Sequence, residues 1–383
     1  MKKKYLLGFI PLLLLASCGS DNTTVEFPNS TDKAYNWDSI ANVSTNSQIT
    51  HFWDYTNHYF KGKSDGSEDW QGYWPQAHAL DLMLDAYERD PSGYQKTVIT
   101  DWYDGVKAKN NNGTFWNMFY DDMGWNAIAT LRAYELTNDA RYKTAAEQLW
   151  GWIKDGWSDN ICGGGVSWVT YKMEFKNAPA TCPAGIFAAR MYETFGNTEY
   201  LDFAKKCCSW VRSTLFNPSS GGVYDGITKT SSGDVLSTAY YSYNQGIYIG
   251  LCMELYKITK ESIYLNDSKL AADFCISHFV DSNTGVMSGT DNGDGGLFNG
   301  IFIRYFTQLI LCEDLSSKYK KSYSTYINKC ATVAWTKGCL TPDILFSYNW
   351  GTKPSLTTYG NPNIAACTLL EAAALLQRKG FID

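Results

Sequence analysis

Apolar residues recur along most of the chain at spacings of three and four, which is the pattern of amphipathic helices. Long alternations of Val, Ile or Thr with polar residues are missing from the sequence, so we expect few strands. The periodic segments predict about twelve helices. They lie near residues 48–60, 74–89, 94–109, 120–137, 140–157, 178–196, 198–216, 240–259, 261–280, 299–318, 320–338 and 362–379.

The short turns between these helices resemble one another. Thr137–Tyr142, Gly196–Tyr200 and Thr259–Tyr264 each place polar turn residues before a tyrosine, and these tyrosines recur about every 60 residues. Six helical hairpins of that length would fill the chain from residue 48 onward. We therefore predict an all-α fold, a closed (α/α)6 barrel of six inner and six outer helices, with an open solenoid as the alternative. No linker divides residues 36–383, so we expect a single domain there.

Three longer loops have unusual Gly-rich sequences, and each follows a helix of the outer type. They are Gly163–Trp168, Gly221–Gly226 and Asp291–Gly296. We expect the three loops to meet at one face of the barrel, where function is normally found. The third loop lacks the alternating ligands and the later Glu of an EF-hand, so we predict that it is a solvated turn.

The N-terminal residues follow the order of an export signal. Met1–Lys4 is basic, and Tyr5–Leu15 is an apolar run that is too short to span a bilayer. The next residues, Leu-Ala-Ser-Cys, resemble a bacterial lipobox, which implies cleavage before Cys18 and lipidation of Cys18. We therefore expect a signal peptide at residues 1–17 and a lipidated, flexible tether at 18–35.

This interpretation places the protein at the outer membrane of a Gram-negative bacterium, attached through the lipid anchor at Cys18. The sequence leaves open whether the protein faces the periplasm or the outside. The alternative is an ordinary secretory signal in which the Cys occurs by chance.

Composition narrows the class of protein. Hydrophobic residues make up 44% of the 383 residues and charged residues 19%, which excludes a disordered chain. The net charge is −6, and about −9 once the three lysines of the signal are removed, so a nucleic-acid partner is not expected. Aromatic residues reach 15%, more than a core needs, which suggests a surface that stacks flat ligands. Only four His are present, which argues against a His-rich metal site.

Two adjacent carboxylates, Asp121 and Asp122, open the helix predicted at 120–137. Acidic residues at a helix N-terminus commonly cap backbone N–H groups and complement the helix dipole. They could instead form a catalytic pair, since retaining glycosidases need two carboxyl groups about 5–5.5 Å apart and adjacent residues can reach that separation. Such proximity raises the pKa of one carboxyl group and prepares it as an acid. Nearby aromatic residues that could stack on sugars are Trp116, Phe119, Tyr120 and Trp125.

The segment Tyr-Asp-Asp-Met-Gly-Trp-Asn-Ala at 120–127, with Leu-Arg-Ala-Tyr-Glu-Leu-Thr at 131–137, resembles the signature of glycoside hydrolase family 76. These are bacterial and fungal α-1,6-mannanases on an (α/α)6 scaffold, and the family usually has Ala where Gly124 stands here. The resemblance covers most of residues 70–380. Four further segments also resemble the family: Gly163–Trp168, Lys176–Ala178, Tyr243–Gly246 and Gly300–Tyr305.

The resemblance implies a retaining endo-α-1,6-mannanase that cuts the backbone of fungal-type mannan or related glycans by double displacement. Asp121 would be the nucleophile and Asp122 the acid/base, with a covalent β-mannosyl enzyme as the intermediate. No cofactor and no metal would be required. The partner would be mannan or manno-oligosaccharides, and we expect a monomer.

Further residues are candidates for binding the substrate. They are Gln76, Trp125, Trp168, Asn177, Asp225, Tyr243, Asn244 and Gln245. Amide side chains offer both donors and acceptors, as a sugar diol requires, and aromatic rings can stack on sugar faces. The alternatives are helix capping for the amides, a turn for Asp225 and burial in the core for the tryptophans. Arg304 lies within a predicted helix, so we expect a structural ion pair.

Two other functions remain open at this point. A non-catalytic glycan-binding lipoprotein of a polysaccharide uptake system would keep the aromatic residues but would not need the carboxylate pair. Another (α/α)6 enzyme acting on acidic sugars would need a basic cleft. The intact Asp121–Asp122 pair counts against the first, and the negative net charge counts against the second.

Overall fold

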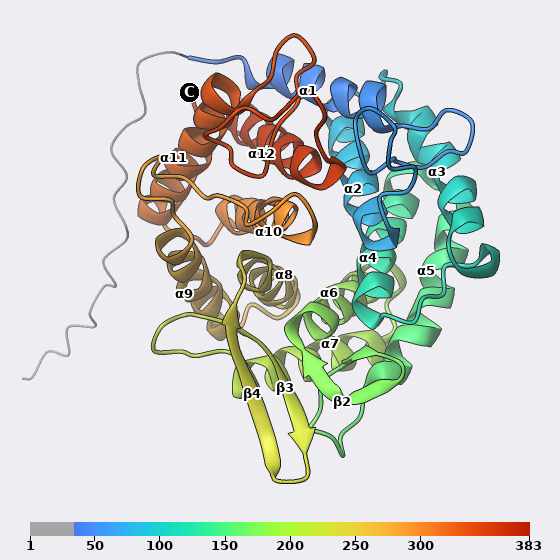
Figure 1. The fold of residues 1–383 in the computed structure, drawn as a ribbon. Coiled ribbons are helices and arrows are strands. Elements are labelled where there is room, and N and C mark those ends of the chain that lie inside the picture. Colours follow the sequence, from blue (N-terminus) through green and yellow to red (C-terminus); the bar gives the residue numbers. More distant parts are fainter. Residues whose placement is uncertain (1–33) are drawn as a thin grey trace, which may run out of the picture.

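The computed structural model describes residues 34–383. The expected signal peptide, the lipidation of Cys18 and nearly all of the tether lie outside the described residues. Within them, twelve α-helices alternate between an outer and an inner ring (Figure 1). The outer helices are α1 (Trp37–Phe52), α3 (Gln95–Lys109), α5 (Ala140–Ile153), α7 (Thr198–Thr214), α9 (Ser262–His278) and α11 (Ser317–Val333). The inner helices are α2 (Tyr73–Arg89), α4 (Tyr120–Thr137), α6 (Ala178–Phe195), α8 (Ser242–Thr259), α10 (Phe298–Leu311) and α12 (Gly360–Arg378).

The ring is closed by contact between the first and the last helix, which confirms the predicted (α/α)6 barrel. The backbone N–H of Trp37 in α1 donates to Oε1 of Gln377 in α12 over 2.9 Å. Figure 1 shows these two helices side by side. The prediction of a first helix at 48–60 was wrong, because α1 begins at Trp37, where Asn36 caps it by accepting from the N–H of Ser39.

The repeated short turns join inner helices to the outer helices that follow. Each inner helix in these turns ends at a residue with a left-handed backbone, which satisfies the last carbonyl groups and reverses the chain. These residues are Asn138, Gly196 and Lys260. The next residue then caps the outer helix in two cases: Asp139 accepts from the N–H of Arg141, and Asn197 accepts from that of Glu199. These turns therefore lie at the end of the barrel where the inner helices end.

The longer loops are fixed by buried polar side chains near the start of the inner helices. Gln245 of α8 accepts from the N–H of Val223 over 2.8 Å and donates to its carbonyl oxygen over 3.0 Å. Gln76 of α2 holds both backbone groups of Phe60 in the same way. Each amide satisfies two backbone groups that burial would otherwise leave unpaired. The loops are thereby held over the end of the barrel where the inner helices begin.

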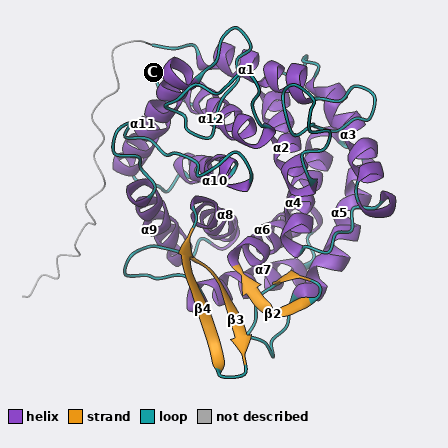
Figure 2. Ribbon diagram, in the orientation of Figure 1, coloured by secondary structure: helices purple, strands orange, loops and turns teal. Residues whose placement is uncertain are grey.

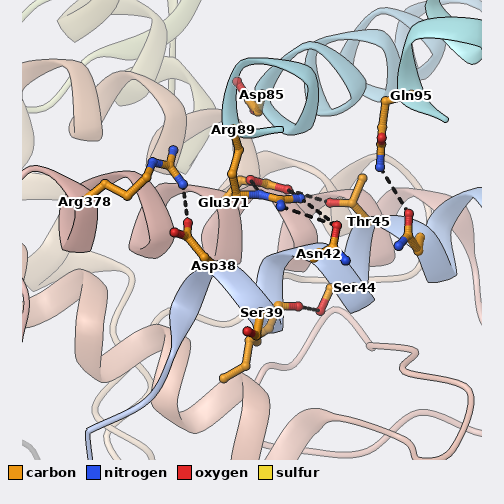
Figure 3. Close-up of polar contacts among 12 residues, drawn as sticks. Asp38, Ser39, Asn42, Ser44, Thr45, Asp85, Arg89, Gln95, Glu371 and Arg378 are labelled. Carbon is orange, nitrogen blue, oxygen red and sulfur yellow. Dashed lines mark hydrogen bonds and ion pairs between the residues drawn. The ribbon is translucent and has the colours of Figure 1, made fainter. Parts of the chain in front are cut away.

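The opposite end of the barrel is filled by buried ion pairs. Arg132 of α4 pairs with Asp81 and Asp85 of α2, with N–O distances of 3.0 and 2.6 Å. Arg304 of α10 also reaches Asp85, at 2.7 Å, so the predicted structural ion pair of Arg304 is confirmed. Figure 3 shows a neighbouring group, in which Arg89 of α2 bonds Glu371 of α12 at 2.9 Å. These pairs tie four inner helices together, namely α2, α4, α10 and α12.

A four-stranded antiparallel sheet lies beside the barrel (Figure 2). Its strands, in spatial order, are β1 (Ser167–Val169), β2 (Lys172–Asn177), β3 (Tyr224–Thr230) and β4 (Gly233–Tyr240). Strand β2 leads directly into α6, and β4 ends just before α8. The sheet is therefore joined to the first turns of two inner helices, and the β3–β4 hairpin projects from the ring.

The described residues also include four short helical turns. They are η1 (Asn111–Gly113), η2 (Lys154–Gly156), η3 (Asp294–Gly296) and η4 (Ala334–Gly338). Across residues 34–383, none of the helices has both the length and the apolar character needed to cross a membrane.

Candidate active site

A cleft of about 600 Å³ opens at the end of the barrel where the inner helices begin. Its walls come from the first turns of α2, α4, α8 and α10, from the sheet, and from the three Gly-rich loops. Each loop contributes a side chain to the cleft: Trp168, Asp225 and Asp294. The prediction that these loops meet at one face is therefore confirmed.

Asp121 and Asp122 lie side by side in the first turn of α4 and line this cleft. The residue in the N-cap position is Phe119, whose side chain makes no capping hydrogen bond. Asp121 instead accepts a hydrogen bond, over 2.9 Å, from the backbone N–H of its neighbour Asp122. The pair is thus presented to the cleft, and capping in the usual geometry does not account for it.

Burial and mutual repulsion raise the pKa values of the two carboxyl groups to different extents. Burial raises the pKa of Asp121, while hydrogen bonds from the Asp122 N–H and from the Trp168 side chain oppose this rise. For Asp122, burial, the charge of Asp121 and the charge of Asp294 all act together and raise the pKa well above its usual range. The proton is therefore held more strongly by Asp122, and Asp121 is the better carboxylate.

Aromatic side chains flank the pair on two sides. On the side of the sheet, the Trp168 ring lies 5.2 Å from that of Phe119 and 6.2 Å from that of Phe175. On the other side, Tyr243 of α8 stacks on Phe298 of α10 with 4.0 Å between ring centroids and 12° between planes. The cleft therefore has two aromatic walls around a carboxylate floor, which suits a ligand with both apolar faces and hydroxyl groups.

Five of the eight residues predicted to bind substrate line the cleft. They are Trp125, Trp168, Asn177, Asp225 and Tyr243. Asn177 also caps α6, since its Oδ1 accepts from the N–H of Ala180 over 3.2 Å. Both roles foreseen for this residue are thus compatible with its position.

The structure differs from the predicted sugar contact at three residues outside the cleft lining: Gln76, Asn244 and Gln245. All three are fully buried. The two glutamines use their amides to hold the loops described above, and Asn244 donates to Oδ1 of Asp225 over 3.2 Å. Their polar groups face the protein because the buried backbone of Phe60 and Val223 and the carboxylate of Asp225 need hydrogen-bond partners.

The Asp291–Gly296 loop is exposed over its first four residues, as predicted for a solvated turn, but its part in the cleft was missed. Asp291 and Asp294 both line the cleft, and the indole N–H of Trp74 donates to Oδ1 of Asp294 over 3.2 Å. The available sequence signal was the position of the loop, since it follows an outer helix as the other two Gly-rich loops do. Tyr241 and Phe298 were also missed, and their apolar or isolated positions gave no signal of their own.

The side chains that line the described cleft include several carboxylates and no Lys, Arg or His. In residues 34–383, no group of three His, Cys, Asp or Glu side chains is arranged to hold a metal ion. Burial raises the pKa of Asp225, while the hydrogen bond from Asn244 opposes the rise. The partial positive charge at the N-terminus of α4 favours the ionised form of Asp121. Such a cleft suits a neutral polar ligand better than an anion.

Comparison with protein families gives a match over nearly the whole chain: the model described as "Glycosyl hydrolase family 76" matches residues 36–382. Among curated proteins, mannan endo-1,6-alpha-mannosidase DCW1 of Saccharomyces cerevisiae is 23% identical over 57% of this chain and 51% of its own length. The chain spans about half the length of the curated relatives it matches first.

Solved structures give closer matches. The GH76A α-1,6-mannanase of Salegentibacter sp. HEL1_6 is 34% identical, with a TM-score of 0.85 over 89% of this chain and 99% of that one. An inactive variant of that enzyme, with two consecutive aspartates changed to asparagine, is known in complex with α-1,6-mannotriose. The mannosidase Bt3792 of Bacteroides thetaiotaomicron has a TM-score of 0.78 over 90% of this chain and all of its own, and at 22% identity it supports the fold alone.

Proposed function

Because the chain belongs to glycosyl hydrolase family 76, we propose that it is a retaining endo-α-1,6-mannanase. The observation that carries the proposal is the Asp121–Asp122 pair in the cleft, in which Asp122 holds its proton more strongly and Asp121 accepts a hydrogen bond from the Asp122 N–H. The inactive double-aspartate variant of the Salegentibacter enzyme supports a role for such a pair. The paired aromatic walls support a sugar substrate.

In the first step, Asp121 attacks the anomeric carbon of an α-1,6-linked mannose, and the bond from that carbon to O6 of the next sugar breaks. Asp122 gives its proton to the departing O6. The product is a β-mannosyl ester on Asp121. Hydrogen bonds from the Asp122 N–H and from Trp168 support this assignment, because they stabilise Asp121 as the carboxylate that must attack.

In the second step, water attacks the anomeric carbon of the ester from the opposite face. Asp122, now without its proton, accepts one from the water while Asp121 leaves as a carboxylate. Esterification removes the charge of Asp121, which is one of the influences that held the proton on Asp122. The pKa of Asp122 is therefore lower at this stage, as expected for a residue that has just delivered its proton. Two inversions give net retention of the α configuration.

Stereochemistry tests the mechanism directly. The full chain would be mixed with α-1,6-mannotetraose, and the first products would be followed by ¹H NMR before mutarotation. The mechanism requires the α-anomer at the new reducing end. Initial formation of the β-anomer would overturn the double displacement.

An endo mode of action is part of the proposal. The cleft is open and has aromatic walls on two sides of the pair, so a long mannan chain has room to pass. The non-catalytic glycan-binding alternative gains no support from the family or from the similar structures. We expect the enzyme to act as a monomer.

Export and lipidation remain proposals that rest on the N-terminal sequence. We infer that Cys18 is lipidated after removal of residues 1–17 and that it holds the enzyme at the outer membrane. Radiolabelled palmitate should be incorporated by the wild-type chain in cells and not by Cys18→Ala. Label in both proteins would contradict lipidation at Cys18. If the label depends on Cys18, protease treatment of intact cells shows which side of the membrane the enzyme faces.

A further inference from the structure

The loop that contains Asp294 is held rigidly at the edge of the cleft. The side chain of Asn361, in the first turn of α12, donates to the carbonyl oxygen of Gly293 over 3.1 Å. A Cβ atom on Gly296 would lie 2.7 Å from Pro362, so only glycine permits this close packing. Trp74 of α2 donates its indole N–H to Asp294. Two inner helices therefore fix the place of one exposed carboxylate.

Asp294 lines the same cleft as the catalytic pair. Its charge raises the pKa of both Asp121 and Asp122, and also that of Tyr243. Burial raises the pKa of Asp294 itself, but the Trp74 hydrogen bond opposes that rise. Because Asp294 stays partly exposed to the cleft and accepts a hydrogen bond from an indole N–H, it is the carboxylate better suited to remain ionised.

The other groups near Asp122 supply no compensating positive charge. The titratable groups around it, with their elements, are Asp121 of α4, Tyr73 of α2, Asp225 of β3, Tyr243 of α8, and Asp291 and Asp294 of the loop before α10. Below the cleft floor, His78 packs against Trp125 with 4.9 Å between ring centroids. Burial lowers the pKa of His78 to about 3, so its ring is neutral.

We propose that Asp294 is a positioning residue for proton delivery: its fixed negative charge keeps Asp122 protonated until a glycosidic oxygen is bound. This role rests on the proposed hydrolysis. The charge of Asp121 disappears when the ester forms, whereas the charge of Asp294 persists through both steps. Asp294 therefore sets how readily Asp122 recovers a proton for the next turnover.

Asp294→Asn tests the proposal because the amide oxygen can still accept from Trp74 while the charge is lost. Asp294→Glu keeps the charge, and Asp234→Asn removes an equivalent charge from the exposed end of β4. The direct readout is the pKa of Asp122 in the full chain, from ¹³C NMR of labelled aspartate carboxyl groups, assigned by the signal that Asp122→Asn loses. This readout needs no substrate.

We expect the pKa of Asp122 to fall by about half a unit or more in Asp294→Asn, and to stay near the wild-type value in Asp294→Glu and Asp234→Asn. The alkaline limb of kcat/KM on α-1,6-mannotetraose should move to lower pH in the same variant, because an acid with a lower pKa loses its proton earlier. An unchanged pKa of Asp122 in Asp294→Asn would overturn the proposal. A shifted pKa in a protein that cleaves no α-1,6-mannan would refute the proposed function and leave the effect of Asp294 established.

Discussion

Asn244 donates a hydrogen bond to Asp225, with 3.2 Å between Nδ2 of the amide and Oδ1 of the carboxylate. Asn244 is fully buried at the start of α8, whereas Asp225 is half-buried and lines the cleft. Next to it, Gln245 holds the backbone of Val223, two residues before Asp225. Two consecutive amides on one inner helix thus fix the position and the orientation of a cleft carboxylate.

The first prediction follows from this contact. Asn244→Ala should lower kcat/KM on α-1,6-mannotetraose about tenfold, the equivalent of one hydrogen bond of roughly 1.4 kcal/mol. Asp225→Asn and the double variant complete the cycle. If Asn244 acts through Asp225, the double variant loses no more activity than Asp225→Asn alone. Additive losses would show that Asn244 acts by another route.

The second prediction concerns the buried ion pair in Figure 3. The side chains of Arg89 and Glu371 are only 6% and 3% exposed, so Glu371→Ala would leave a buried charge unpaired. We expect the free energy of unfolding to fall by about 3–5 kcal/mol, measured by denaturant titration. The matched control is Asp38→Ala, which removes the partner of Arg378 from a pair with side chains 45% and 33% exposed. That change should lower the free energy of unfolding by less than about 1 kcal/mol. Equal losses in the two variants would contradict a stabilising role for the buried pair.

The third prediction compares two glycines within helices. A Cβ atom on Gly246 of α8 would lie 2.6 Å from the Cα of Phe302 in α10, a backbone atom that cannot move aside cheaply. Gly246→Ala should therefore destabilise the protein by about 1–3 kcal/mol. Gly151 of α5 has no atom within 4 Å of the same position, so Gly151→Ala should stabilise it by about 0.5–1 kcal/mol. Thermal unfolding of both variants measures the two effects, and a stabilising Gly246→Ala would show that the helices are less closely packed.

The fourth prediction is a stability gain at the active site. The pKa of Asp122 is raised in the folded protein, so the folded state binds more protons than the unfolded state between the two pKa values. The contribution of protonated Asp122 to the stability of the folded state is fully present below the unfolded pKa of about 4. It is lost as pH rises through the folded pKa. Asp122→Asn should therefore raise Tm at pH 7.5 by about 2 °C or more, with a smaller gain at pH 4.5. An equal gain at both pH values would show that the charge of Asp122 is not its cause.

Much of this architecture could be predicted from the sequence. Helical periodicity and the repeated Tyr turns gave the barrel, because the same packing requirement recurs in every hairpin. The first helix was misplaced, since the buried contacts of Trp37 with the C-terminal helix depend on a ring closure that no local pattern reports. The small sheet was not predicted, because its middle strands β2 and β3 pair across α6 and α7, and because β4 buries none of its side chains fully and so shows no clear apolar alternation.

The site could be predicted only in part, for a physical reason. Asp121 and Trp168 lie in recognisable motifs, and both line the cleft. Gln76 and Gln245 have the same functional groups as a sugar-binding amide, yet each satisfies a buried loop, and sequence does not distinguish these two uses. Asp294 was missed because its role depends on Trp74, which lies more than 200 residues earlier in the chain.

The central claim is that the Asp121–Asp122 pair cleaves internal linkages of α-1,6-mannan. Its most direct test is digestion of linear α-1,6-mannan by the full-length protein, with Asp121→Asn and Asp122→Asn in parallel and the products read by chromatography and mass. We predict a ladder of short manno-oligosaccharides from the wild type and loss of that ladder in both variants. Mannose as the sole product would contradict the endo mode, and undiminished cleavage by either variant would contradict the assignment of the catalytic pair.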